Sequence, residues 1–304
     1  GGREPGRKGR LIMSTTALAL VNEITTAVSA QVRGYLSKGT LQLPANYSAE
    51  NALKAAALML PEVKNKDGVP ALKSCTSDSI KSSLLSMCIQ GLNPDKDQCY
   101  FIPYGSHLTL QRSYFGDVSV AKRVDPNIED IFPAVVFEGD KFEYKIKRGK
   151  IVEINHQQKL ENKDKPIVAA YATVVYKDGR EISTIMTRKQ LLQAWSQSPI
   201  HPVGAGGKLN PSSTHGKFPE KMACKTVIHR VCKPIIDSSS DQSLFARCVR
   251  QTDDAADAAE ADEDAEENAN QQYIDTDEAP AGVDPETGEV TDEPAAAKKE
   301  EEPF

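Results

Sequence analysis

The spacing of apolar residues changes twice along the chain, and this change constrains the fold more than any other feature of the sequence. Near both ends of the chain's main body, apolar residues recur every three or four positions, the period of an amphipathic helix. Between them, from about residue 98 to residue 187, apolar and polar residues alternate, which is the period of a half-buried strand. Helical spacing is found at residues 15–38, 48–60, 76–91, 187–195, 219–233 and 242–249. This order predicts an α+β fold in which a helical N-terminal part precedes a mainly antiparallel central sheet packed with a long C-terminal helix.

The central part divides into short strands because turn sequences such as YGSH, EGD, RGK and KDGR interrupt the alternation. A short helix is predicted at residues 113–124, between two groups of strands. Residues 196–217 have no periodic pattern and many turn formers, and loops of that length in a compact body are usually functional or mobile. The predicted strands are residues 98–105, 107–113, 132–138, 141–147, 150–155, 166–176 and 181–187.

The charge of the chain is divided sharply between two parts. The net charge is −6, but residues 251–304 hold 20 acidic residues and 2 lysines, a charge of −18 that leaves +12 for residues 1–250. The acidic segment has hardly any large apolar residues, so we expect a disordered tail. Residues 1–12 lack periodicity and are expected to be a leader outside the fold, which leaves residues 13–250 as the folded core. The basic excess of that core points to a polyanion such as nucleic acid or an anionic membrane surface.

Several functional classes find no support in the residues. Apolar runs are shorter than the roughly 18 residues of a membrane span, so we expect a protein of the cytoplasm without a membrane partner. The six cysteines include no C-x-x-C pair, which favours reduced thiols in the core. Cys224, His229 and Cys232 do not converge on one helix face, so no metal is expected. The stretch GAGGKLN lacks the first glycine and the Ser or Thr of a phosphate loop, and no catalytic motif is found. We therefore expect neither a nucleotide cofactor nor an enzyme.

Two groups of cationic residues are candidates for contact with nucleic acid. On the predicted helix at residues 219–233, Lys221, Lys225 and His229 share one face with no glutamate between them. This face favours bound phosphates, and a solvated lysine face is the alternative. Around the first predicted hairpin, cations alternate with aromatic residues, which suits single-stranded nucleic acid because rings stack on bases while cations follow the backbone. Aromatic residues in strands are more often core, so the cations of this group are the stronger candidates.

The sequence resembles the RecT family of phage single-strand annealing recombinases over about residues 13–240. Five stretches carry the resemblance in family order: SSLLSMCIQGLNPDKDQCYFIPYG, LQRSYFGDVSVAKR, KPIVAAYATVVYKDG, MTRKQLLQAWSQS and HGKFPEKMACKTVIHRVCKP. The resemblance implies an α+β core, ATP-independent binding of single-stranded DNA, and annealing of the coated strand to its complement. It also implies assembly into rings or helical filaments and a companion 5′-to-3′ exonuclease in the bacterial host cell.

We therefore expect the protein to bind single-stranded DNA and the annealed duplex through cations and rings from several parts of the sequence. Phosphate contacts release counterions and leave the bases free for pairing, so no covalent step is needed. The N-terminal helices are candidates for contacts between protomers. A passive coat for single strands and a nuclease with unrecognised metal ligands remain as alternatives. The expected DNA-binding residues are Tyr104, Arg112, Tyr114, Lys122, Arg123, Arg188, Lys208, Lys217, Lys221, Lys225 and Arg230.

The acidic tail has three possible roles. Its charge could compete with other anions for an empty DNA groove. Its last residues, EEEPF, resemble the acidic Pro-Phe end of bacterial single-stranded DNA-binding proteins, so the tail could contact the host single-stranded DNA-binding protein or other partners. A tail that only increases solubility is the third reading.

Overall fold

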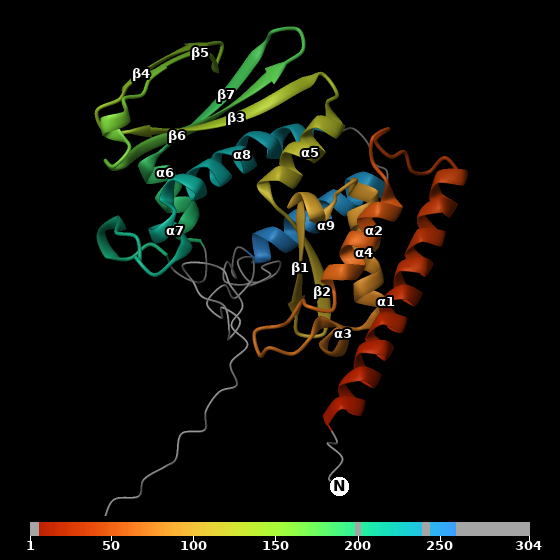
Figure 1. The fold of residues 1–304 in the computed structure, drawn as a ribbon. Coiled ribbons are helices and arrows are strands. Elements are labelled where there is room, and N and C mark those ends of the chain that lie inside the picture. Colours follow the sequence, from red (N-terminus) through yellow and green to blue (C-terminus); the bar gives the residue numbers. More distant parts are fainter. Residues whose placement is uncertain (1–5, 198–201, 239–243, 260–304) are drawn as a thin grey trace, which may run out of the picture. The chain divides into compact units, whose positions relative to one another are not determined.

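The computed structural model describes residues 6–197, 202–238 and 244–259, and it has the mixed helix and sheet content that the sequence predicts (Figure 1). The N-terminal part is helical. Ser48 and Thr76 begin two of its helices, because each hydroxyl accepts a hydrogen bond from the backbone N–H three residues later. Gly91 ends the last of them in a left-handed conformation, with φ of 72°. The helices are α1 (Gly6–Ser37), α2 (Ala49–Met59), α3 (Ala71–Ser74) and α4 (Ser77–Gln90).

A two-stranded hairpin follows the helices and packs against α4. Its strands are antiparallel, and the tight turn brings Tyr104 opposite His107. Ser113 then begins the next helix by accepting a hydrogen bond from the backbone N–H of Gly116. The elements are β1 (Cys99–Tyr104), β2 (His107–Arg112) and α5 (Tyr114–Val124), and three short 3-10 helices lie at Pro94–Lys96, Leu160–Asn162 and Ala205–Gly207.

The second sheet has five antiparallel strands in the order β3-β6-β7-β5-β4. Strand β7 pairs along its whole length with residues 169–175 of β6, whereas β5 pairs with β7 at Ile151 and Ser183 alone. The β4–β5 hairpin therefore joins the sheet through a narrow connection. The strands are β3 (Ile128–Phe137), β4 (Lys141–Lys147), β5 (Lys150–Gln157), β6 (Ile167–Tyr176) and β7 (Glu181–Thr187).

A long helix covers one face of this sheet, as Figure 1 shows for α8 beneath β3, β6 and β7. The covered face is apolar because every second residue of β6, from Ala170 to Val174, is fully buried. The opposite face carries exposed apolar residues, among them Phe132 and Ile146. The helices of this part are α6 (Arg188–Trp195), α7 (Thr214–Lys217), α8 (Pro219–Asp237) and α9 (Leu244–Ala259). Within the described residues, no helix combines the length and apolar character that a bilayer crossing requires.

The structure differs from the sequence-based expectation at the ends of three helices. Helix α1 begins at Gly6, inside the expected leader, because extending a formed helix costs little and needs no apolar face. Helix α8 continues through Pro234 to Asp237. Helix α9 continues past Arg250, where the folded core was expected to end. Thr252 and Asp253 are buried there, so tertiary contacts keep this part of the acidic segment helical.

Candidate nucleic-acid interface

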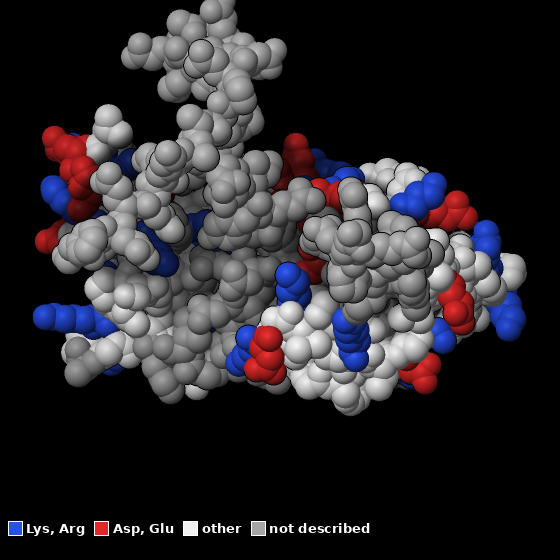
Figure 2. Space-filling model, turned by 60° about the horizontal axis from the view of Figure 1, so that its bottom comes forward, with Lys and Arg blue, Asp and Glu red and all other residues white. Residues whose placement is uncertain are grey.

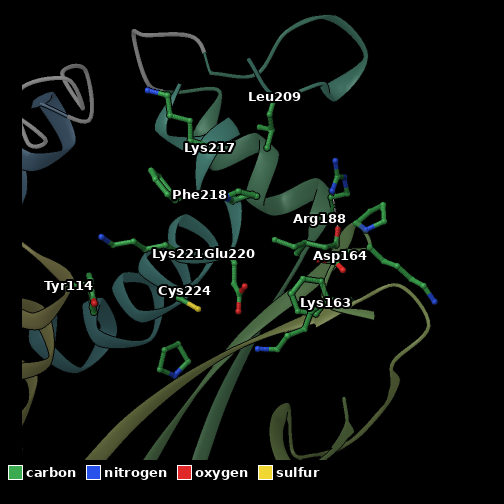
Figure 3. Close-up of a pocket in the computed structure, with 16 residues that line it drawn as sticks. Tyr114, Lys163, Asp164, Arg188, Leu209, Lys217, Phe218, Glu220, Lys221 and Cys224 are labelled. Atoms are coloured by element: carbon green, nitrogen blue, oxygen red, sulfur yellow. Dashed lines mark hydrogen bonds between the residues drawn. The ribbon is translucent and has the colours of Figure 1, made fainter. Parts of the chain in front are cut away.

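A pocket of about 920 Å³ opens between the first turns of α8 and the edge of the five-stranded sheet. Figure 3 shows Tyr114 of α5 at one end of the pocket and Arg188 of α6 at the other. The lining contains five cations and two carboxylates, so its charge is positive. The cations are Lys163, Lys165, Arg188, Lys217 and Lys221, and the carboxylates are Asp164 and Glu220.

The lysines of α7 and α8 are placed by a tight local turn. Gly216 lies so close to the backbone that an added Cβ would be 2.1 Å from the carbonyl oxygen of Asn210. No other residue type fits there, because real Cβ atoms do not approach a backbone oxygen so closely. Pro219 then occupies the first position of α8, where a missing N–H costs nothing. Lys217 at the end of α7 and Lys221 in the first turn of α8 therefore lie on either side of the turn between these helices.

Arg188 and Lys165 are fixed by hydrogen bonds on the sheet side of the pocket. Arg188 Nη1 donates to the carbonyl oxygen of Ile167 at 3.0 Å, and Lys165 Nζ donates to Asn162 Oδ1 at 2.8 Å. Arg188 also begins α6, where Thr187 and Gln190 form the capping box that the sequence predicts. Both cations keep donors free for a ligand, because neither forms an ion pair in the described part of the chain.

The remaining lysines of the pocket lack a compensating carboxylate. Lys163, Lys217 and Lys221 are exposed and make no ion pair with any residue that the structure describes. An excess of positive charge in a concave surface raises the local concentration of anions. Burial, together with the charge of Glu220, raises the pKa of the Cys224 thiol to about 11, so this thiol is neutral at physiological pH. The pocket is therefore suited to binding an extended anion.

Four of the predicted DNA-binding residues line this pocket: Tyr114, Arg188, Lys217 and Lys221. Lys163 and Lys165, on the opposite side, are not among the predicted residues. Their signal is the stretch NKDK before β6, but clustered lysines are common in surface loops and the pattern is weak. Phe218 belongs to the family-like stretch HGKFPEKMACKTVIHRVCKP and lies between two predicted cations, but the DNA contacts were expected from the cations.

Four other predicted residues lie outside the pocket lining. Tyr104 is half-buried at the end of β1, and Lys225 is half-buried on α8. Lys208 and Arg230 are exposed, and Lys208 precedes Leu209, which does line the pocket. Their role in DNA contact stays a prediction.

Arg112 differs most from the expectation, because the structure places it in the interior. Its side chain is 3% exposed. Arg112 Nε donates to Asp117 Oδ1 at 3.0 Å, and Nη2 donates to Asp253 Oδ1. A guanidinium that is enclosed and paired with two carboxylates cannot reach a DNA phosphate. The expected phosphate contact is therefore corrected to a structural role.

The two neighbouring cations of α5 also have partners within the protein. Lys122 Nζ forms an ion pair with Asp130 Oδ1 at 2.8 Å. Arg123 donates to the carbonyl oxygens of Ile89 and Gln42, and its guanidinium lies 4.1 Å from the centre of the Phe245 ring. These contacts join α5 to other parts of the fold. They give Lys122 and Arg123 a structural role that does not require DNA.

The predicted cationic face of α8 is divided between two environments. Lys221 lines the pocket, whereas His229 Nδ1 donates to Asp117 Oδ2 at 3.0 Å in the contact between α8 and α5. Figure 2 shows lysine and arginine side chains standing apart on the face it presents, with acidic side chains between them. Lys221 and His229 therefore do not act as one cationic face of α8.

Comparisons with known proteins point to one family. A family model described as the RecT family matches residues 50–273, which include every residue that lines the pocket. The protein named Protein RecT of Escherichia coli (strain K12) is 29% identical over 201 residues, which are 63% of this chain and 68% of that protein.

Proposed function

Because the chain belongs to the RecT family, whose members are single-strand annealing proteins of DNA recombination, we propose that it holds single-stranded DNA in the pocket beside α8 and pairs it with a complementary strand. The observation that carries this assignment is the charge of the pocket, where five cations face two carboxylates. None of these five cations makes an ion pair in the described part of the chain, so phosphates would not have to displace a protein carboxylate from them.

The proposed mechanism is electrostatic. Lys163 and Lys165 on one side, and Lys217 and Lys221 on the other, contact the phosphates of an extended strand and release its counterions. The bases then pair with the second strand, and the neutralised backbone of the bound strand repels that second strand less. The stretch GAGGKLN lacks the residues of a nucleotide-binding loop, which supports annealing without ATP.

We propose further that the protein acts as a homo-oligomer, as a ring or a helical filament, in phage recombination. Adjacent protomers would continue the cationic pocket along the strand, with the N-terminal helices as contact surfaces. A 5′-to-3′ exonuclease would supply the single-stranded end. The acidic tail would contact the host single-stranded DNA-binding protein or compete with DNA for the pocket.

Mixing two complementary fluorescent oligonucleotides tests the function directly. We expect the protein to accelerate pairing without ATP and with no requirement for magnesium. Strands that are bound but not paired would make the protein a passive coat, and strands that shorten in the magnesium arm would make it a nuclease.

The variant Lys217→Ala with Lys221→Ala tests the site. We expect weaker binding to all sequences, and a plot of log affinity against log salt that is shallower by about 1.4, because each phosphate contact to a single strand contributes about 0.7. The matched control is Lys96→Ala with Lys177→Ala, which removes the same charge at two exposed lysines outside the pocket. Equal salt slopes for the two variants would exclude the pocket as the strand site.

A further inference from the structure

Phe218 exposes an aromatic ring among the cations of the pocket. The residue is 54% exposed and lies between Lys217 and the first turn of α8. Figure 3 shows its side chain in the pocket near Leu209 and Lys221. Leaving half of a phenylalanine in water forgoes a large part of the free energy that its burial would yield. A ligand that covers the exposed ring would gain this free energy.

The backbone of Phe218 is fixed by the two helices that it separates. Its N–H donates to the carbonyl oxygen of Thr214 at 2.8 Å, and its own carbonyl oxygen accepts from the N–H of Met222 at 3.1 Å. Gly216 packs against Asn210 on one side, and Pro219 fixes the chain direction on the other. The backbone that carries the ring is therefore held at a defined place beside the pocket, which reduces the entropy lost when a ligand packs on the ring.

The neighbours of the ring indicate the ligand. Lys217 and Lys221 flank it in the sequence and supply cations for phosphates, while the ring supplies a flat apolar surface. A bare phosphate would use the lysines alone, and stacked bases inside a duplex would leave the ring without a partner. A nucleotide of a single strand uses both, because its base has a face that stacks on an aromatic ring.

We propose that Phe218 stacks on one nucleobase of the strand held in the pocket. This inference rests on the proposed function and adds a base-binding position to it. Stacking tolerates all four bases, so the position would not confer sequence preference. It would hold the strand by one base per pocket and leave the neighbouring bases free to pair.

Abasic DNA tests the inference because it keeps the phosphates and removes the bases. We expect Phe218→Ala to bind an ordinary single strand about 5- to 150-fold more weakly than the unmodified protein does. We expect less than about a twofold change for an abasic strand of the same length, since no base is there to stack. The variant Phe218→Tyr keeps the ring and should restore binding. Phe218→Leu keeps apolar bulk without a ring and should not.

The lysine variant described above distinguishes failure of the proposed strand site from failure of base stacking on Phe218. Lys217→Ala with Lys221→Ala should weaken binding of both the ordinary and the abasic strand. If it changes neither, the pocket is not the strand site and the proposed function of the pocket fails. If it weakens both while Phe218→Ala changes neither, or changes both equally, then stacking alone is overturned. A change in oligomeric state with Phe218→Ala but not with Phe218→Tyr would instead assign the ring to a protein contact and overturn stacking as well.

A fluorescent variant gives a second readout that does not depend on truncating the ring. Phe218→Trp adds one tryptophan to the single native one, Trp195, which is 7% exposed. We expect an ordinary strand to quench the added fluorescence and an abasic strand to leave it unchanged. Equal quenching by both strands would contradict stacking.

Discussion

The guanidinium of Arg112 connects four elements of the fold. From β2 it donates to Asp117 of α5, to Gln90 of α4 at 3.0 Å, and to Val249 and Asp253 of α9. Burial by itself would raise the pKa of Asp117, but the hydrogen bond from His229 and the charge of Arg112 outweigh it and hold this pKa below its usual 3.8. The ionised carboxylate therefore contributes stability above that pH, and the contribution is lost on acidification.

Replacing Arg112 should destabilise the protein without changing how it contacts phosphates. Arg112→Ala leaves two buried carboxylates without their cation, so we expect a loss of about 3–5 kcal/mol in the free energy of unfolding, measured with urea. The control Arg230→Ala removes an exposed arginine and should change this free energy by less than about 0.5 kcal/mol. A shallower salt dependence of DNA binding by folded Arg112→Ala would contradict the structural role.

At the scale of elements, the turn between β3 and β4 is organised by one carboxylate. The side chain of Asp140 has no exposed surface and accepts four hydrogen bonds. These come from the N–H of Phe137 at 2.9 Å, Asn162 Nδ2 at 2.8 Å, the N–H of Lys159 at 3.2 Å and His156 Nε2 at 3.2 Å. Burial opposes ionisation here, but the hydrogen bonds outweigh it and place the pKa of Asp140 well below 3.8. The turn thus ties the β4–β5 hairpin to the loop that carries Lys163 and Lys165.

The variant Asp140→Asn should lose stability in a pH-dependent way. At neutral pH we expect a loss of about 1–3 kcal/mol, because an amide cannot accept all four hydrogen bonds. A carboxylate with a depressed pKa stabilises the fold above its unfolded pKa and stops doing so as pH falls through the folded one. The difference between variant and unmodified protein should therefore shrink below about pH 4. Urea unfolding at several pH values measures it, with Glu138→Gln as an exposed control on the same turn. A difference independent of pH would contradict the assignment.

At the scale of the whole molecule, the boundary between the basic core and the acidic segment crosses helix α9. The sequence places the charge change after Arg250, whereas Thr252 and Asp253 are buried and hydrogen-bonded to Gln90 and Arg112. The first turns of the acidic segment therefore belong to the core, because their polar side chains neutralise and satisfy groups inside it.

Two truncations test this boundary. A chain that ends after Ala259 keeps the contacts of α9, so we expect it to unfold at the same urea concentration as the full chain and to anneal DNA. A chain that ends after Arg250 loses the carboxylate of Asp253 and should be less stable by several kcal/mol. If the two truncated chains are equally stable, the folded core ends at Arg250, as the sequence predicts.

Elements and site differ in how far the sequence predicts them. All seven strands and the helices α2, α4, α5 and α6 lie close to their predicted ranges, because caps and periodicity act between residues a few positions apart. Of the predicted cations, Arg188, Lys217 and Lys221 line the pocket, whereas Arg112 is buried. A lysine or arginine can line a binding pocket or be buried in an ion pair. The local sequence pattern is the same in both cases, so it could not tell these residues apart.

The sequence by itself determined the order of helices and strands, the family resemblance, and the separation of a basic body from an acidic end. Only the tertiary structure decided which charges face a ligand. Arg112 and Asp253 are 141 positions apart and meet in the interior, while Lys163 and Lys221 come from separate elements and line one pocket. The reason is physical: backbone periodicity depends on neighbours along the chain, whereas the solvation and pairing of a charge depend on whatever packing brings beside it.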